Sequence, residues 1–247
     1  MLRDVPSPGP HQPLPAVVMN RPLLRQTLTI VGKDLRREWR SREILTTTIA
    51  FAVLLMVIFT FAFYHDDETI SLVFPGILWI AIVFTGTLAV SRTFQHERDS
   101  DCLRALALIP GSQYSLYLGK FIVNLIFIAI FELALIPLLI FTFSIDVSGT
   151  LGLHILTVAV GTVGFAALGT LVSAMLVRND LREILLPIVL YPLLIPLLIA
   201  AVQVTSAIVD GAGWPEVGSW IQAMIAMDLL YALLSLALFR WVLAAVE

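Results

Sequence analysis

Charged residues are scarce in this sequence of 247 residues. Only 13% of the residues are Asp, Glu, Lys or Arg, whereas 59% are hydrophobic. About a quarter of the residues of a soluble domain are charged, so this composition excludes an ordinary soluble domain and indicates a membrane protein. Cysteine is scarcer still, because Cys102 stands alone. A single cysteine excludes a disulfide within the chain and says little about the redox compartment.

Motifs for enzyme catalysis are also missing. The sequence contains no G-x-x-x-x-G-K-[ST] phosphate loop, so we expect this chain to bind no ATP itself. It contains no His-Glu-x-x-His motif and no nucleophile elbow. A hydrolase therefore has little support, and we expect neither catalytic nor metal-binding residues.

Long apolar runs are abundant instead. A membrane-spanning helix needs about 20 largely apolar residues, because each residue rises about 1.5 Å through a hydrocarbon layer of about 30 Å. Backbone groups must be paired in lipid, so continuous apolar runs predict helices. Six runs meet this requirement. They cover residues 44–63, 71–91, 116–143, 153–177, 184–206 and 220–246.

Lysine and arginine are distributed unevenly around these runs. None of the 15 lies in residues 64–69, 144–153 or 207–219, which connect runs one and two, three and four, and five and six. All of them lie before the first run, in the other two connections, at the start of run three or near the end of run six. Because cytoplasmic loops are enriched in Lys and Arg, we expect both termini inside and the three Lys- and Arg-free connections outside.

The N-terminal segment, residues 1–22, contains six of the 13 prolines. It has no continuous apolar core of the kind that a signal peptide needs. We therefore expect a disordered Pro-rich tail, followed by a single membrane domain over residues 23–247.

Residues 23–43, just before the first run, have the pattern of an amphipathic helix. Apolar residues recur at helical spacing, at Leu24, Leu28, Val31, Leu35 and Trp39. The cations of the other faces are Lys33, Arg36, Arg37 and Arg40. The pattern predicts an interfacial helix on the inner membrane surface, with its cations near anionic head groups. An ordinary positive flank of the first run explains the cations equally well, but it does not explain the apolar stripe.

A charged stretch, residues 91–120, separates the second and third runs. Asp99 or Ser100 can cap the start of a helix, and Pro110 with Gly111 ends it. The sequence therefore predicts an amphipathic helix of about two turns. Two interpretations are open: a solvated connection with one helical turn, or a coupling helix whose apolar face inserts into a partner protein.

Two carboxyl groups lie within the runs, Glu132 in the third and Asp228 in the sixth. Such groups are costly in a membrane and are functional candidates for that reason. No Lys or Arg lies at matching depth. We expect protonated carboxyls, hydrogen bonds to polar neighbours such as Asn124 or Tyr231, or a water-filled cavity. A polar clamp between helices and a transport role are both open.

The charged stretch and its flanks resemble a known family. Residues 74–120, from FPGILWIAIVFTG to SQYSLYLGK, are similar to the second span, coupling segment and start of the third span of the heme exporter protein B family. These proteins, often called CcmB, are the membrane permeases of the cytochrome c maturation ABC system. The resemblance covers almost the whole chain after about residue 23. It continues through FELALIPLLIF (131–141), GTVGFAALGTLVSAM (161–175), VRNDLREILLPIVLYPLLIPLLIAA (177–201) and AMDLLYALLSLALF (226–239). One departure is Asp101-Cys102, where many members carry a small residue.

The resemblance implies an all-α, six-span permease with the ABC-2 type exporter fold, in a bacterial inner membrane with both termini cytoplasmic. It implies a second copy of this permease, two copies of a separate ABC ATPase subunit, a heme-handling membrane partner and a periplasmic heme chaperone, with no nucleic acid. ATP would bind to the partner subunit, and heme would be cargo and not a cofactor of this chain. The coupling helix, around residues 97–110, would dock the ATPase through Glu97, Arg98, Asp99, Asp101, Leu103, Arg104, Leu106 and Pro110.

Heme leaves no signature of its own in the sequence. There is no Cys-x-x-Cys-His motif, so we expect no covalently attached heme. Histidine is the natural axial ligand of heme iron. His65 and His154 lie near the outer ends of runs one and four, where a lone histidine is more often a polar boundary residue. Two rival functions are open: a permease of the same fold for a lipid or polysaccharide, and a non-transporting clamp that the ATPase opens to release a loaded chaperone.

Overall fold

The computed structural model describes residues 23–62, 67–94, 112–147 and 149–244. Within these ranges the regular structure is entirely helical, which confirms the all-α prediction. The helices are α1 (Leu23–Ser41), α2 (Glu43–Ala62), α3 (Asp67–Ser91), α6 (Ser112–Phe143), α7 (Leu151–Met175), α8 (Arg182–Val209) and α9 (Trp214–Ala244).

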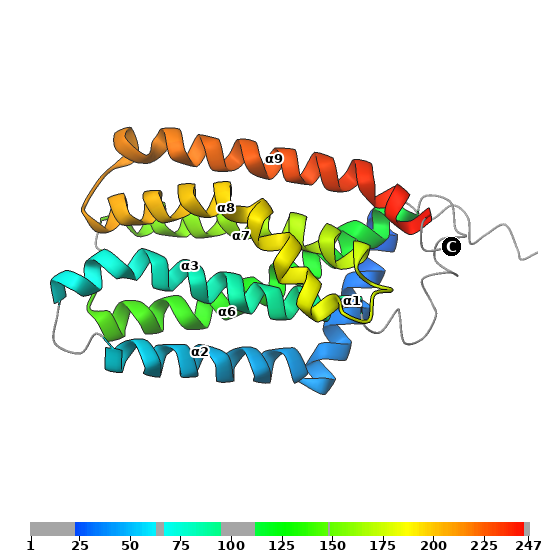
Figure 1. Cartoon of the computed structure of the whole chain (residues 1–247), viewed down its shortest axis with the longest axis horizontal. Helices are drawn as coiled ribbons and strands as arrows, with labels where there is room; N and C mark the ends of the chain where they lie inside the picture. The colour runs from blue at the N-terminus through cyan, green and yellow to red at the C-terminus, as the bar shows by residue number, and fades with distance from the viewer. Residues whose placement is uncertain (1–22, 63–66, 95–111, 148, 245–247) are drawn as a thin grey trace, which may run out of the picture.

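The six helices from α2 to α9 run alternately up and down in one elongated bundle (Figure 1). Among the described residues, five of them are long and apolar enough to cross a membrane, namely α3, α6, α7, α8 and α9. The continuous apolar part of α2, Ile49–Ala62, is shorter. The structure therefore shows a polytopic helical bundle, and the sixth span stays a prediction.

The outer faces of the bundle expose large apolar side chains. Phe61 of α2 is 81% exposed, Leu72 of α3 77% and Leu233 of α9 67%. Burial of such side chains in a water-soluble protein is strongly favoured, and contiguous apolar surface is rare there. Together with the five apolar helices, this surface identifies a multi-pass membrane protein.

α7 is largely buried, and it packs against α3, α6, α8 and α9. Small residues allow this close packing. A Cβ on Gly161 would overlap the indole of Trp79, and one on Gly164 would overlap the carboxyl of Asp228. The indole Nε1 of Trp79 then donates to Thr205 Oγ1 of α8 at 3.0 Å, so that α3, α7 and α8 meet at one point.

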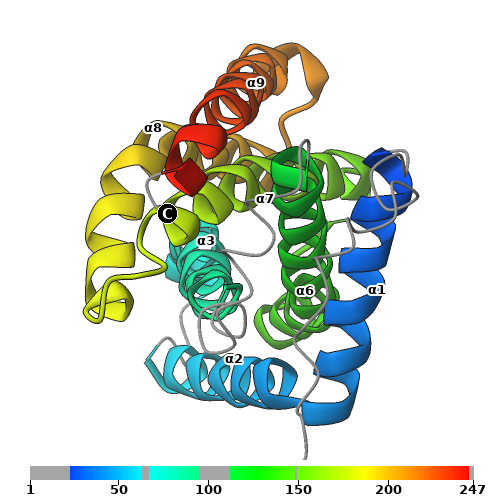
Figure 2. The same ribbon diagram turned by 90° about the vertical axis from the view of Figure 1, so that its right-hand side faces the viewer.

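α1 runs across one end of the bundle and not along it (Figures 1 and 2). It packs mainly against α6, burying Thr27, Val31 and Glu38. The predicted helix at 23–43 is confirmed, but its apolar stripe does not act as a unit. Val31 and Leu35 pack against the bundle, whereas Leu24, Leu28 and Trp39 are exposed. The packed face is therefore rotated from the predicted one, toward the more polar side that includes Thr27.

A sharp corner connects α1 to α2 at Arg42. This residue has φ of 54°, a left-handed conformation that is uncommon for residues other than glycine. Its amide donates to Glu38 O at 2.7 Å, and its carbonyl accepts from the amide of Thr46 at 2.9 Å. One residue thus ends α1 and begins the next helix in a new direction, as Figure 2 shows.

Basic residues gather at the end of the bundle where α1 lies. The lysines and arginines of the described ranges belong to α1, the α1–α2 corner, the residue after α3, the first third of α6, the α7–α8 connection, the start of α8 and the last turns of α9. At the opposite end, the α6–α7 and α8–α9 connections carry Asp146 and Asp210 and no Lys or Arg. The charge asymmetry predicted from the sequence is thus a property of the two ends of the folded bundle.

Candidate functional site

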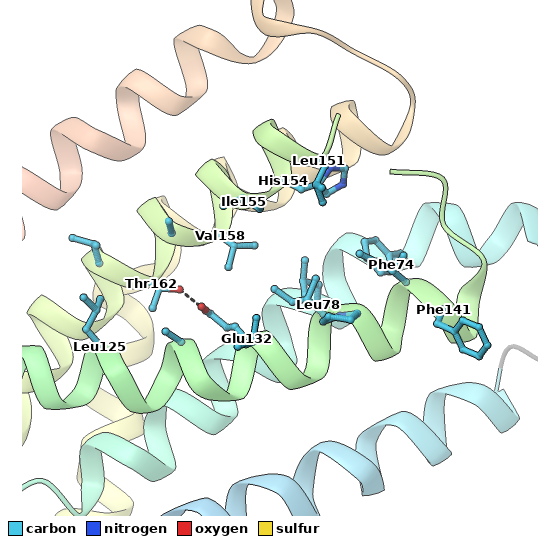
Figure 3. A pocket seen from close by; sticks show the side chains of 17 residues that line it. Phe74, Leu78, Leu125, Glu132, Phe141, Leu151, His154, Ile155, Val158 and Thr162 are labelled. Atoms are coloured by element: carbon cyan, nitrogen blue, oxygen red, sulfur yellow. Dashed lines mark hydrogen bonds between the residues drawn. The ribbon is translucent and has the colours of Figure 1, made fainter. Parts of the chain in front are cut away.

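A cavity of about 680 Å³ lies between α6 and α7, with α3 behind it (Figure 3). Its wall is formed by 17 residues. Three of them are polar: Glu132, His154 and Thr162. The rest are aliphatic or aromatic, so the cavity is an apolar slot with a few polar groups. Small-molecule and cofactor sites in proteins have this size and this composition.

Glu132 lies deep in the wall of this slot and is 6% exposed. Its Oε1 accepts a hydrogen bond from Thr162 Oγ1 of α7, drawn as the dashed line in Figure 3. Asn124, the neighbour expected from the sequence, has other partners, Thr93 just after α3 and Thr170 of α7. Thr162 was missed because no periodic pattern relates two residues on different helices, 30 positions apart.

His154 lies in the first turn of α7, at the end of the cavity away from α1, and is 6% exposed. Its Nδ1 lies 3.2 Å from the carbonyl oxygen of Thr150. A carbonyl only accepts hydrogen bonds, so this contact places the imidazole proton on Nδ1. Nε2 then carries a free lone pair. Within the described residues this atom is buried and has no hydrogen-bond partner. His65, the other candidate, lies outside the described residues.

Asp228 does not belong to the cavity, because it reaches α7 from the other side, from α9. It is 7% exposed and fits against Gly164, where a Cβ would collide with its carboxyl oxygen. Its Oδ1 has no hydrogen-bond partner among the described residues. The hydroxyl of Tyr231, an expected partner, donates instead to Leu193 O at 2.7 Å. The two intramembrane carboxyls therefore occupy separate environments, with α7 between them.

A second polar cluster, the Lys120 cluster, lies at the α1 end and consists of Lys120, Asp34, Thr93 and Phe94. The ammonium of Lys120 lies 2.8 Å from Asp34 Oδ2 of α1 and donates to Thr93 O, just after α3, at 2.8 Å. It also lies 5.4 Å from the ring centroid of Phe94. The lysine is only 2% exposed. This ion pair connects α1, the end of α3 and α6.

Hydrogen bonds extend from the Lys120 cluster into the bundle. Thr93 Oγ1 donates to Asn124 Oδ1 at 2.6 Å, and Asn124 Nδ2 donates to Thr170 Oγ1 of α7 at 2.9 Å. Near the start of α6, Ser115 Oγ donates to Gln26 Oε1 of α1 at 2.9 Å. Each of these bonds joins different segments of the chain, so both flanks of residues 95–111 are fixed to the rest of the bundle.

The predicted ATPase-coupling residues lie outside the described residues, because all of them fall within 95–111. They are Glu97, Arg98, Asp99, Asp101, Leu103, Arg104, Leu106 and Pro110. The predicted cations of α1 are described, and all four are exposed: Lys33, Arg36, Arg37 and Arg40. Metal-binding clusters of three or more His, Cys, Asp or Glu side chains are absent from the described part of the chain.

Comparison with known proteins gives the family. The model of the family described as CcmB protein matches residues 25–245. Heme exporter protein B of Haemophilus influenzae is 25% identical over 75% of this chain and 82% of its own length. Heme exporter protein B of Pseudomonas aeruginosa is 21% identical over 81% of this chain and 89% of its own length. Since the family match spans nearly the whole helical bundle, the chain belongs to the CcmB family.

Proposed function

We propose that this chain is the membrane permease subunit of an ABC transporter complex for cytochrome c maturation. It would couple ATP hydrolysis by a separate ATPase subunit to heme export, or to release of the heme-loaded periplasmic chaperone. The observation that carries the proposal is the CcmB family match over residues 25–245, in a chain that folds as an apolar helical bundle. ATP would be hydrolysed by the partner subunit, and this chain would carry out no catalysis.

The proposal includes a topology of six spans in a bacterial inner membrane, with both termini cytoplasmic and the ABC-2 type exporter fold. The location of the described lysines and arginines at the α1 end supports this orientation, because positive residues favour the cytoplasmic side. α2 would be the sixth span. In this orientation α1 lies at the inner surface, where Arg36, Arg37 and Arg40 can contact anionic head groups.

The ATPase would dock on the segment between α3 and α6. Both flanks of this segment belong to the α1 end. The Lys120 cluster fixes them to α1, and the hydrogen bonds of Asn124 to Thr93 and Thr170 fix them to α7. A force applied to the segment would therefore reach several helices at once. Two copies of this chain, two ATPase subunits, a heme-handling membrane partner and a periplasmic heme chaperone complete the proposed complex.

Co-purification with the candidate ATPase tests the proposal. Leu103 and Leu106, both changed to Asp, should abolish ATPase capture and ATP turnover while the chain still inserts into the membrane, because charges would replace the apolar face of the predicted coupling helix. Leu108→Asp is the control, since Leu108 belongs to another face of that helix. If the double variant captures the ATPase as well as the unaltered chain does, the docking site is elsewhere, and α1 becomes the surface to test.

A further inference from the structure

We propose that the cavity between α6 and α7 is an intramembrane heme site, in which His154 Nε2 binds the heme iron and the apolar wall holds the porphyrin. The inference rests on the proposed function, which supplies heme as the cargo of the complex. It adds to that function a specific site within this chain.

The dimensions and composition of the cavity suit a flat, largely apolar molecule. Its volume of about 680 Å³ lies within the range of about 300–1,000 Å³ that is usual for ligand sites. Its wall extends along α7 from Leu151 to Val163, which corresponds to about 18 Å of helix at 1.5 Å per residue. Figure 3 shows this wall facing α6, with the two helices diverging toward Leu151 and Phe141.

His154 has the chemistry of an iron ligand. Proteins commonly hold heme iron through a histidine. The nitrogen of a ligating imidazole that does not bind the metal usually donates to a carbonyl or carboxylate, which fixes the tautomer and the ring orientation. The contact between Nδ1 and Thr150 O has this form, and it leaves the lone pair of Nε2 for the metal. Because Nε2 is covered in this structure, the side chains around it must move aside as heme enters, while the contact between Nδ1 and Thr150 O is kept.

The buried, unpartnered Nε2 also favours heme over a lipid chain as the occupant. A polar atom that is buried without a partner loses its hydrogen bonds to water and gains none in return. An acyl chain in the slot would leave that loss in place, whereas an iron atom would satisfy the lone pair. A histidine that only marks the membrane boundary would be expected to reach water, and His154 does not.

The polar groups of the wall also determine the orientation of the porphyrin. Thr162 lies eight residues farther along α7 than His154, which is about 12 Å deeper in the bundle, and Glu132 of α6 accepts its hydrogen bond there. A heme propionate placed there would meet a carboxyl and no cation. The propionates should therefore point toward water at the end of the bundle away from α1, beside the first turn of α7.

Heme titration of the purified permease–ATPase complex tests the site. Ferric heme would be added to the complex in lipid nanodiscs, and the Soret and visible bands would be followed. Loss of even an outer partner of a metal ligand lowers metal affinity about 10- to 100-fold, so His154→Ala should weaken heme binding by at least that factor. His65→Ala is the matched control and should leave the affinity unchanged. Added imidazole should restore the histidine-type spectrum to His154→Gly.

A second pair of variants leaves the histidine in place. Ala159→Phe fills the slot from α7 and should abolish heme binding without changing ATPase capture. Ala134→Phe, at an exposed position of α6 outside the cavity, should bind heme normally. If His154→Ala and Ala159→Phe both bind heme like the unaltered complex, the site is elsewhere.

The outcomes also separate this inference from the proposed function. A complex that captures the ATPase and supports cytochrome c maturation, but binds no heme in the titration, overturns the site and leaves the permease function standing. A second outcome also overturns the inference. If lipid co-purifies with the unaltered complex but not with Ala159→Phe, and both bind heme equally, the slot is a lipid site. The titration decides the site irrespective of ATPase capture, which tests the function alone.

Discussion

Lys120 has the most deeply buried ammonium among the described residues, and its partners come from two other segments, α1 and the residues just after α3. Asp34 is 86 positions away in the sequence, and Thr93 is 27 positions away. From the sequence, this lysine could be predicted only as part of the positive flank of a span. Its ion pair could not be predicted, because no pattern of spacing relates it to an acidic residue on another helix. For the same reason Glu132 could be predicted as a buried carboxyl, whereas its partner Thr162 could not.

Lys120→Met should destabilise the protein markedly. Removing one member of a buried ion pair leaves the other charge uncompensated, at a cost of about 3–5 kcal/mol. The expected loss here is toward the lower end, because the side chain of Asp34 is still 13% exposed. Thermal unfolding in detergent, followed by tryptophan fluorescence, measures the effect. Lys120→Met with Asp34→Asn should recover part of the loss, and a double variant no better than the single one would contradict the pairing.

At the scale of helices, the sequence predicted most of what the structure has. Apolar runs of about 20 residues must be helical in lipid, so each of the six predicted spans coincides with a helix to within a few residues. The packed face of α1 was harder to predict. Its orientation depends on a groove in α6, where Gly119 lies so close to Ile30 that a Cβ would collide. A helical spacing identifies an apolar stripe, but it does not say which neighbour the helix will meet.

The α1–α2 corner depends on the left-handed conformation of Arg42. The stability of a variant at this position should therefore depend on how well the new residue tolerates that conformation. Arg42→Asn should keep the stability of the corner, since asparagine tolerates this conformation. Arg42→Val should be about 1–2 kcal/mol less stable than Arg42→Asn, because a Cβ strains a left-handed backbone and a branched one is tolerated worst. Both variants lose the charge, so thermal unfolding of the pair isolates the backbone effect. Equal stability would show that the corner relaxes.

For the whole molecule, the two ends of the bundle differ in charge. This difference is visible in the sequence, is kept in the folded bundle and favours one orientation in the membrane. The alternation of helices brings the Lys- and Arg-rich segments to one end, although they are far apart in the sequence. Residues 23–41 and the α7–α8 connection then lie at the same end of the bundle as the end of α3 and the start of α6. A bilayer would separate this end from the connections that hold Asp146 and Asp210. The cavity extends toward these connections, because Phe141 and Leu151 belong to its wall.

Cysteine labelling should establish this orientation, because the chain has a single native cysteine to remove. In a Cys102→Ser background, a thiol reagent that does not cross membranes should label Asp210→Cys in intact spheroplasts. Asn179→Cys, equally exposed but at the α1 end, should be labelled only after permeabilisation. The native acidic residue at 210 has little influence on orientation, so its loss should not change the topology.

Gly32→Cys on α1 decides whether α2 is the sixth span. Gly32 is exposed, and a side chain there meets no neighbouring atom, so the substitution should not disturb packing. If α2 crosses the membrane, α1 lies on the same side as Asn179, and both cysteines need permeabilisation. If the short apolar part of α2 stays in one leaflet, Gly32→Cys should instead be labelled together with Asp210→Cys. That result would leave five spans and place α1 on the outer side, away from the proposed ATPase, so the model of coupling through α1 and the Lys120 cluster would fail with it.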